Sequence, residues 1–348
     1  MSTMLKTPPL AEFQLGASVR RVAARRDAQL IAVIVAIVVV SSAAAGAQFF
    51  SARLIASFLI AAMVTAFVAL GQTFVVITRG IDLSVSPILG LSAVCVGFLA
   101  QGSGFPLGLG LLLGAGIGAV LGVGNGLLVS GLGLPPIIAT LGTFSVYGGL
   151  QFLITNGNQV NTIPSQYTQF GVATFDIVPG VPWLLLGGVA ATLIVGFVLR
   201  YTVFGRNLFA TGGDVEAAFR AGIPTRRVIF LAYVICGLLA GVAGVIYLMR
   251  TGSANAITGT DTNQNLNSIA AALIGGTALT GGRGSATGAL LASIFLALSL
   301  NAMGIAAHIP VEWQPAGVGV LILLAVIADP RARQGRAIKS VFARRRTR

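Results

Sequence analysis

Long apolar runs separated by short polar stretches dominate the pattern of this chain. Runs of about 20 residues are long enough to cross a hydrocarbon core of roughly 30 Å. Only helices and closed barrels cross a bilayer, and these runs lack the alternation typical of strands, so they predict helices. We therefore expect an all-α polytopic membrane protein with about ten transmembrane helices, at 28–49, 53–77, 81–100, 105–129, 135–155, 181–199, 228–249, 266–281, 284–303 and 314–328.

The basic residues flank these spans. They cluster at 20–26, around 200–227 and from 331 to 348. With both termini in the cytoplasm, ten spans place 20 of the 22 Lys and Arg residues inside and leave Arg53 and Arg250 outside. Because positive charge favours the cytoplasmic side, this topology is the expected one. It divides the chain into a basic cytoplasmic N-terminal tail (1–27), a transmembrane domain (28–330) and a basic cytoplasmic C-terminal tail (331–348).

The first apolar run leaves an alternative open. The stretch AQLIAVIVAIVVVSSAAAGAQ has the apolar core and the A-x-A-like end of a cleaved signal peptide. However, about 27 residues precede it, which is long for such a leader, and the run continues toward Phe50. A retained first span is therefore the favoured interpretation.

Composition agrees with a membrane protein. Hydrophobic residues make up 55% of the chain and charged residues 9%, and the mean hydropathy is +0.92, whereas soluble domains carry about 25% charged residues. The net charge of +13 could suit nucleic acid, but its position at span ends indicates membrane lipid instead, and no nucleic-acid partner is expected. Cys95 and Cys236 lie in apolar runs without a CxxC motif or a nearby His, so we expect small buried hydrophobes.

Few residues are suited to catalysis. The chain has one His, two Lys and nine acidic residues, and it contains no GxxxxGK[ST] phosphate-binding motif. Both lysines, Lys6 and Lys339, lie in the tails, and His308 near Glu312 is expected to be an ordinary interfacial residue. We therefore expect a chain that is not an enzyme and holds no metal or cofactor of its own.

Small and polar residues divide the rest of the pattern. Two polar segments, 156–180 and 251–267, are expected to be loops or short interfacial helices on the outer side. Glycines that recur every four residues predict close helix packing; they are Gly110, Gly114, Gly118, Gly122 and Gly126, with Gly237 and Gly241 repeating the device.

A few polar side chains within the spans are candidates for function. Asp82 is the main acid at a span boundary; it is either a functional intramembrane group or the cap of a helix that starts at Leu83. Uncharged polar residues could line a path for a neutral solute or simply hydrogen-bond between helices. These candidates are Gln72, Thr73, Asn125, Thr140, Thr143 and Asn301.

A charged segment, RNLFATGGDVEAAFRAGIPTRRV at 206–228, separates two apolar runs. Asp214 can cap a helix that has Glu216 in its first turn and Arg220 in its last. Gly222 then ends the helix, and Pro224 prevents its continuation. Such a helix of about two turns needs packing to be stable. Its Ala217, Ala218 and Ala221 are small enough to fit closely into another protein's groove; the alternative is a solvated loop helix.

Four quoted stretches carry a family resemblance over about residues 30 to 330. VVITRGIDLSVSPILGLSAV, GNGLLVSGLGLPPIIATLGTFSVYGGL, GIPTRRVIFLAYVICGLLAGVAGVIYLMR and SIAAALIGGTALTGGRGSATGALL resemble the permease subunits of bacterial ABC importers for monosaccharides, the ribose-type family. The GIDLS and IGGTALTGG blocks are the most specific. Two positions depart from the family pattern: Ser86-Pro87 follows GIDLSV in place of Gly-Ser, and Asn265 and Asn267 stand where acids are usual.

The resemblance implies a multi-pass subunit of the bacterial inner membrane, paired with a second permease copy or paralogue. It further implies a cytoplasmic ATPase subunit that binds ATP and Mg, and a periplasmic sugar-binding protein. The segment 206–227 would then couple to the ATPase through Asp214, Glu216, Ala217, Ala218, Arg220 and Gly222. Two alternatives stay open: a permease of the same type for a nucleoside or polyol, and a secondary carrier or channel.

Overall fold

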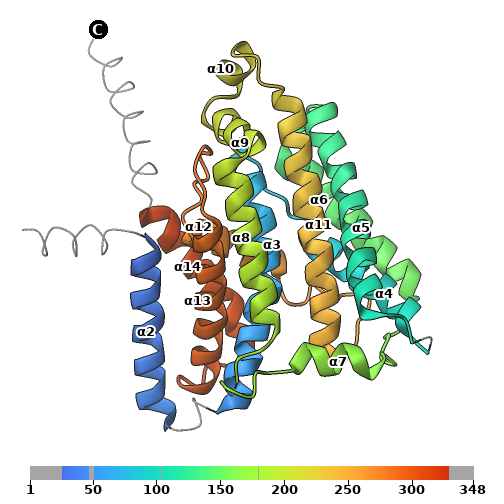
Figure 1. The fold of residues 1–348 in the computed structure, drawn as a ribbon, viewed down its shortest axis with the longest axis vertical. Coiled ribbons are helices and arrows are strands. Elements are labelled where there is room, and N and C mark those ends of the chain that lie inside the picture. Colours follow the sequence, from blue (N-terminus) through green and yellow to red (C-terminus); the bar gives the residue numbers. More distant parts are fainter. Residues whose placement is uncertain (1–25, 47–50, 103, 179, 329–348) are drawn as a thin grey trace, which may run out of the picture.

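The chain forms a helical bundle (Figure 1). The computed structural model describes residues 26–46, 51–102, 104–178 and 180–328. The tails expected at 1–27 and 331–348 therefore lie outside the described residues, apart from Arg26 and Asp27. Within the described part the only β-structure is two isolated bridges, Val160 with Ala254 and Thr174 with Pro182, which confirms the all-α class.

The helices follow one another with short connections. They are α2 (Arg26–Ala45), α3 (Ala52–Ile77), α4 (Val85–Ala100), α5 (Leu107–Gly126) with the π-helical turn η2 (Leu127–Gly131), α6 (Pro136–Thr155), α7 (Ser165–Val172), α8 (Leu184–Tyr201), α9 (Val203–Gly213), α10 (Val215–Arg220), α11 (Thr225–Thr251), α12 (Gln264–Ile274), α13 (Ala286–Ile305), the 3₁₀ turn η3 (Val311–Trp313) and α14 (Gln314–Ala328).

Seven described helices are long and apolar enough to cross a membrane: α2, α3, α5 with η2, α6, α8, α11 and α13. Helices α4 and α14 are shorter apolar helices. Nine of the ten expected spans thus contain an apolar helix among the described residues, whereas the span expected at 266–281 contains only the short helix α12.

The expected span 266–281 is wrong in its second half. Helix α12 has 11 residues and ends at Ile274, a length of about 16 Å at 1.5 Å per residue. Gly275 follows as its C-cap, and Gly276 has a φ of 103°, which continues no helix. The apolar run continues to 281, but its glycines and threonines form turns.

Helix α3 occupies the centre of the bundle. Its residues from Ala62 to Ile77 are all buried, and the helix packs against α8, α11, α12 and α13. Since an apolar helix can also face lipid, it is the burial of this stretch that identifies α3 as the central helix. The long helix α11 is its principal neighbour together with α13.

The glycine repeat allows α5 and α11 to pack closely, as the sequence predicts. Helices α5 and α11 pack closely along it. A Cβ atom at Gly118 would lie 2.1 Å from the carbonyl oxygen of Gly237, and one at Gly241 would lie 2.0 Å from that of Gly114. Since such separations are far below van der Waals contact, only glycine permits this approach. The close-packing prediction is confirmed.

The two ends of the bundle differ in character. Helices α9 and α10 lie at one end and α7 at the other (Figure 1). The two polar segments, 156–180 and 251–267, meet at the α7 end, where Val160 and Ala254 exchange backbone hydrogen bonds of 2.8 and 2.9 Å. Segment 156–180 includes the short helix α7, as expected. The basic segment 200–227 and the polar segments are thus at opposite ends.

Candidate transport site and coupling helix

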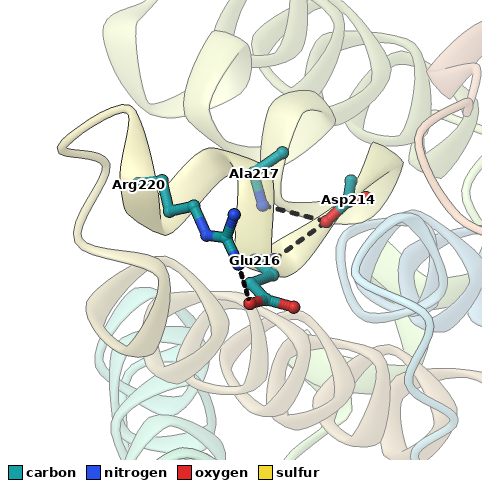
Figure 2. A network of polar contacts seen from close by, with 4 residues as sticks. All are labelled: Asp214, Glu216, Ala217 and Arg220. Atoms are coloured by element: carbon teal, nitrogen blue, oxygen red, sulfur yellow. Dashed lines mark hydrogen bonds and ion pairs between the residues drawn. The ribbon is translucent and has the colours of Figure 1, made fainter.

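Helix α10 is a short capped helix (Figure 2). The Asp214 carboxylate accepts hydrogen bonds from the backbone N–H groups of Glu216 (3.0 Å) and Ala217 (2.9 Å). Arg220 in the last turn forms an ion pair with Glu216 one turn earlier. Gly222 has a φ of 82° and ends the element. The predicted cap and stop are confirmed, because they depend only on local backbone requirements.

The pKa of the capping Asp214 carboxyl is lower than that of a free carboxyl. Hydrogen bonding from the Ala217 N–H, and then from that of Glu216, lowers the pKa of Asp214, and the charges of Arg79 and Arg220 lower it further. Because the folded-state pKa is depressed, the capping contribution is present above the pKa of a free carboxyl. It is lost only as the pH falls through the lower folded value.

The exposed surface of α10 differs from the expected one. Ala217 and Ala221 are exposed, but Ala218 is only 5% exposed and is buried within this chain. Its expected contact with a partner protein is therefore wrong. A helix of this length presents its remaining faces outward, and they carry Phe219 (68% exposed) and Val215 (37% exposed). The most exposed apolar side chain of α10 is therefore Phe219, which the alanine pattern did not indicate.

Asp82 is the centre of a buried polar network. Its carboxylate accepts hydrogen bonds from the backbone N–H (2.9 Å) and the hydroxyl (2.7 Å) of Ser84. Asn125 of α5 donates to the same carboxylate at 3.2 and 3.4 Å, and Thr143 of α6 donates to the Asn125 carbonyl oxygen at 2.7 Å. A buried carboxylate requires such donors. The network joins the connection between α3 and α4 to α5 and α6.

The sequence placed Asp82 either as a helix cap or as a functional group. Helix α4 begins at Val85, not at Leu83, and Ser84 is its N-cap residue without a side-chain cap bond. The Asp82 carboxylate therefore accepts hydrogen bonds from Ser84, just ahead of the helix. The prediction that Asp82 caps a helix starting at Leu83 is wrong, because the helix starts two residues later. Pro87 lies in the first turn of α4, where proline is tolerated.

Other candidates divide into two groups. Gln72 donates its side-chain amide to the backbone carbonyl of Asp82, and Thr140 donates to the carbonyl of Ile81 at 3.1 Å. They thus belong with Asn125 and Thr143 around one connection. Thr73 and Asn301 instead donate to carbonyl oxygens of their own helices, Ala69 and Ala297. A pathway role for these residues stays a prediction.

The first turns of α4 and α12 meet inside the bundle. The backbone N–H of Asn265 donates to the Ser86 hydroxyl at 2.7 Å. Gln264 beside it accepts a 3.1 Å hydrogen bond from Thr65 of α3, and both of these side chains are buried. Asn267 donates back to the carbonyl of Thr262. Both departures from the resembled pattern, at 86–87 and at 265–267, thus lie at one place.

This meeting point was not predicted. Gln264 was not a candidate, and Ser86 was noted only as a departure from the family pattern, because the sequence gives no direct evidence of a contact between residues 179 positions apart.

The chain matches a family model described as the permease component of the branched-chain amino acid transport system, over residues 54–326. The autoinducer 2 import system permease protein LsrC of Photorhabdus luminescens is 32% identical over 286 residues, 82% of this chain and 84% of that protein. The protein of the same name from Enterobacter sp. (strain 638) is 35% identical over 266 residues, 76% of each chain. No solved structure matches the chain.

The family match covers most of the transmembrane domain, including the α10 segment and both blocks that meet at Ser86 and Asn265. Apolar helices and import-system permease relatives agree with a multi-pass membrane protein that is a transport subunit rather than an enzyme. The chain therefore belongs to this family of import permease components, and within it to the ribose-type permeases of ABC importers.

Proposed function

We propose that the chain forms the translocation path of an ATP-driven importer in the bacterial inner membrane. In this proposal a periplasmic binding protein delivers a monosaccharide or a related small polar solute, and a cytoplasmic ATPase subunit binds ATP and Mg and supplies the energy. A second permease copy or paralogue completes the path. The family membership and the relatives that import autoinducer 2 support this assignment.

The observation that carries the proposal is the form of α10. It is a short helix at the end of the bundle (Figure 1), fixed by the Asp214 cap and presenting Phe219 at 68% exposure. An exposed aromatic on a rigid element is well suited to fill a pocket on a partner protein. The Glu216–Arg220 pair beside it is solvent-exposed and adds little stability. We propose that α10 is the coupling helix that docks on the ATPase, with this end of the bundle in the cytoplasm.

The proposed path is polar but carries little charge. Hydrogen-bonding groups hold a neutral sugar without trapping it, whereas a charged lining would favour ions. The network of Gln72, Asn125, Thr140 and Thr143 supplies such groups, and Asp82 is satisfied by its neighbours. We propose that this region borders the path and changes its contacts during transport.

The test replaces the exposed aromatic. Phe219→Glu should reduce co-purification of the ATPase strongly, since a buried aromatic anchor contributes about 2 kcal/mol or more to such an interface. The permease and its cognate ATPase are co-expressed, the permease is captured by a tag, and the ATPase is quantified by immunoblot.

The matched control is Phe170→Glu. This residue of α7 is 45% exposed at the opposite end of the bundle, so the same substitution there should leave the captured ATPase unchanged. Equal capture by wild type and Phe219→Glu would show that α10 is a loop helix and does not dock on the ATPase.

A further inference from the structure

Three backbone segments converge behind α10. They are the end of α3 and its next residues (Ile77–Arg79), the end of α9 (Gly212–Gly213) and the α12–α13 loop at Gly281–Gly282; we call this the backbone junction. The N–H of Gly282 donates to the Ile77 carbonyl at 3.0 Å. Arg79 donates from Nε to the Gly212 carbonyl at 2.8 Å and from Nη2 to the Gly213 carbonyl.

The three backbone segments of the junction lie so close together that no side chain fits between them. A Cβ atom at Gly212 would lie 1.8 Å from the Ile77 carbonyl oxygen and 2.7 Å from the Gly282 nitrogen. One at Gly281 would lie 2.5 Å from the Gly212 carbonyl oxygen. Segments in such direct backbone contact cannot slide past one another without breaking the packing, so they move together.

Arg79 holds an unusual backbone conformation in this junction. Its φ is 67°, in the left-handed region that glycine adopts freely and that is strained for other residues. The guanidinium of Arg79 is the group that donates hydrogen bonds to the end of α9. The strained backbone is therefore offset by two hydrogen bonds that a glycine cannot make.

The junction lies between α10 and the interior network. Asp214, the cap of α10, directly follows Gly213. The residues after Arg79 lead to Asp82 and to the start of α4, and the residues before Gly281 lead back to α12. The two helices reached in this way are the pair whose first turns meet at Ser86 and Asn265.

We propose that the backbone junction, clamped by Arg79, transmits displacement of α10 to α4 and α12. Arg79 is then a positioning residue that acts by holding the α9–α10 turn against the α3–α4 connection. This inference rests on the proposed docking of α10. It adds that removal of the Arg79 clamp should leave binding of the ATPase intact while reducing transport.

Arg79→Gly removes the clamp and relieves the backbone strain at once. The variant should fold and should capture the ATPase within about twofold of wild type, because α10 and Phe219 are unchanged. Uptake of labelled D-ribose or autoinducer 2, whichever the wild-type complex accumulates, into vesicles holding the whole complex should fall about tenfold, a factor within the range typical of coupling between sites. The ATP hydrolysed per molecule imported should rise correspondingly, which a purely structural role would not produce.

Two further variants control this result. Arg79→Lys keeps a donor that can bind one of the two carbonyls, so it should restore part of the uptake. Asn156, the C-cap of α6, also has a positive φ, of 48°. Asn156→Gly therefore relieves a similar backbone strain elsewhere in the bundle, and this variant should transport like wild type.

Wild-type uptake by Arg79→Gly, with the ATPase bound, would overturn the inference. So would loss of folding in both Arg79→Gly and Arg79→Asn, since neither residue strains this backbone conformation and Arg79 would then be structural only. Failure of wild type to capture the ATPase would instead refute the docking of α10, a result that the Phe219→Glu experiment gives separately.

Discussion

At the scale of single residues, long-range partners decide what a polar side chain does. Asp82 is held by Ser84 two residues away and by Asn125 of α5. From the local sequence it could be a helix cap or a functional acid, because both interpretations need the same residue at the same place. The contact with Asn125, 43 residues away, is invisible in the local pattern.

Glycine gives the sharpest residue-scale prediction. Gly118→Ala adds a methyl group 2.1 Å from the Gly237 carbonyl oxygen, so α5 and α11 must move apart. We expect a loss of about 1–3 kcal/mol, typical of overpacking, measured as a lower midpoint of thermal unfolding in detergent.

The control lies two residues earlier in the same helix. A methyl group at Gly116 would meet nothing within 4 Å, so Gly116→Ala should be neutral or slightly stabilising, as expected for alanine in a helix. Equal midpoints for the two variants would contradict the packing account.

At the scale of elements, the sequence predicted best what local rules determine. Helix α10 follows from Asp214, Gly222 and Pro224, and its cap and end are where those residues place them. Helix α12 shows the opposite case. The apolar pattern continues beyond Ile274 to residue 281. The helix, however, ends at Ile274, and the chain after its C-cap Gly275 forms the junction with α3 and α9. A tertiary contact therefore overrode the apolar pattern.

The orientation of the elements is tested by two cysteines. In a background with Cys95 and Cys236 replaced by alanine, a cysteine at Thr162, which is exposed at the α7 end, should react with an impermeant maleimide in intact cells. One at Ala221, exposed just after α10, should react only after the membrane is opened.

Labelling of both positions in intact cells, or of Ala221→Cys alone, would contradict the proposed topology. The result is independent of transport, because each cysteine reports only the side of the membrane that its own loop faces.

At the scale of the whole molecule, the bundle links an exposed helix at one end to a buried polar centre. Helix α3 lies in the middle, the α3–α4 connection carries both Arg79 and Asp82, and α4 and α12 start against each other. The class, the family and the two ends of the bundle followed from hydropathy, charge and quoted motifs. The convergence of segments near residues 77, 212 and 282 did not, since only the folded backbone brings them together.

The most direct test of the central claim is uptake by the reconstituted complex. Vesicles containing the permease and its ATPase, with the binding protein outside and ATP enclosed, are given labelled D-ribose, and autoinducer 2 and leucine are tested in parallel. We predict accumulation of D-ribose or autoinducer 2, and not of leucine, that requires the ATPase and hydrolysable ATP. Accumulation at the same rate without the ATPase would contradict the account and identify the chain as a secondary carrier or channel.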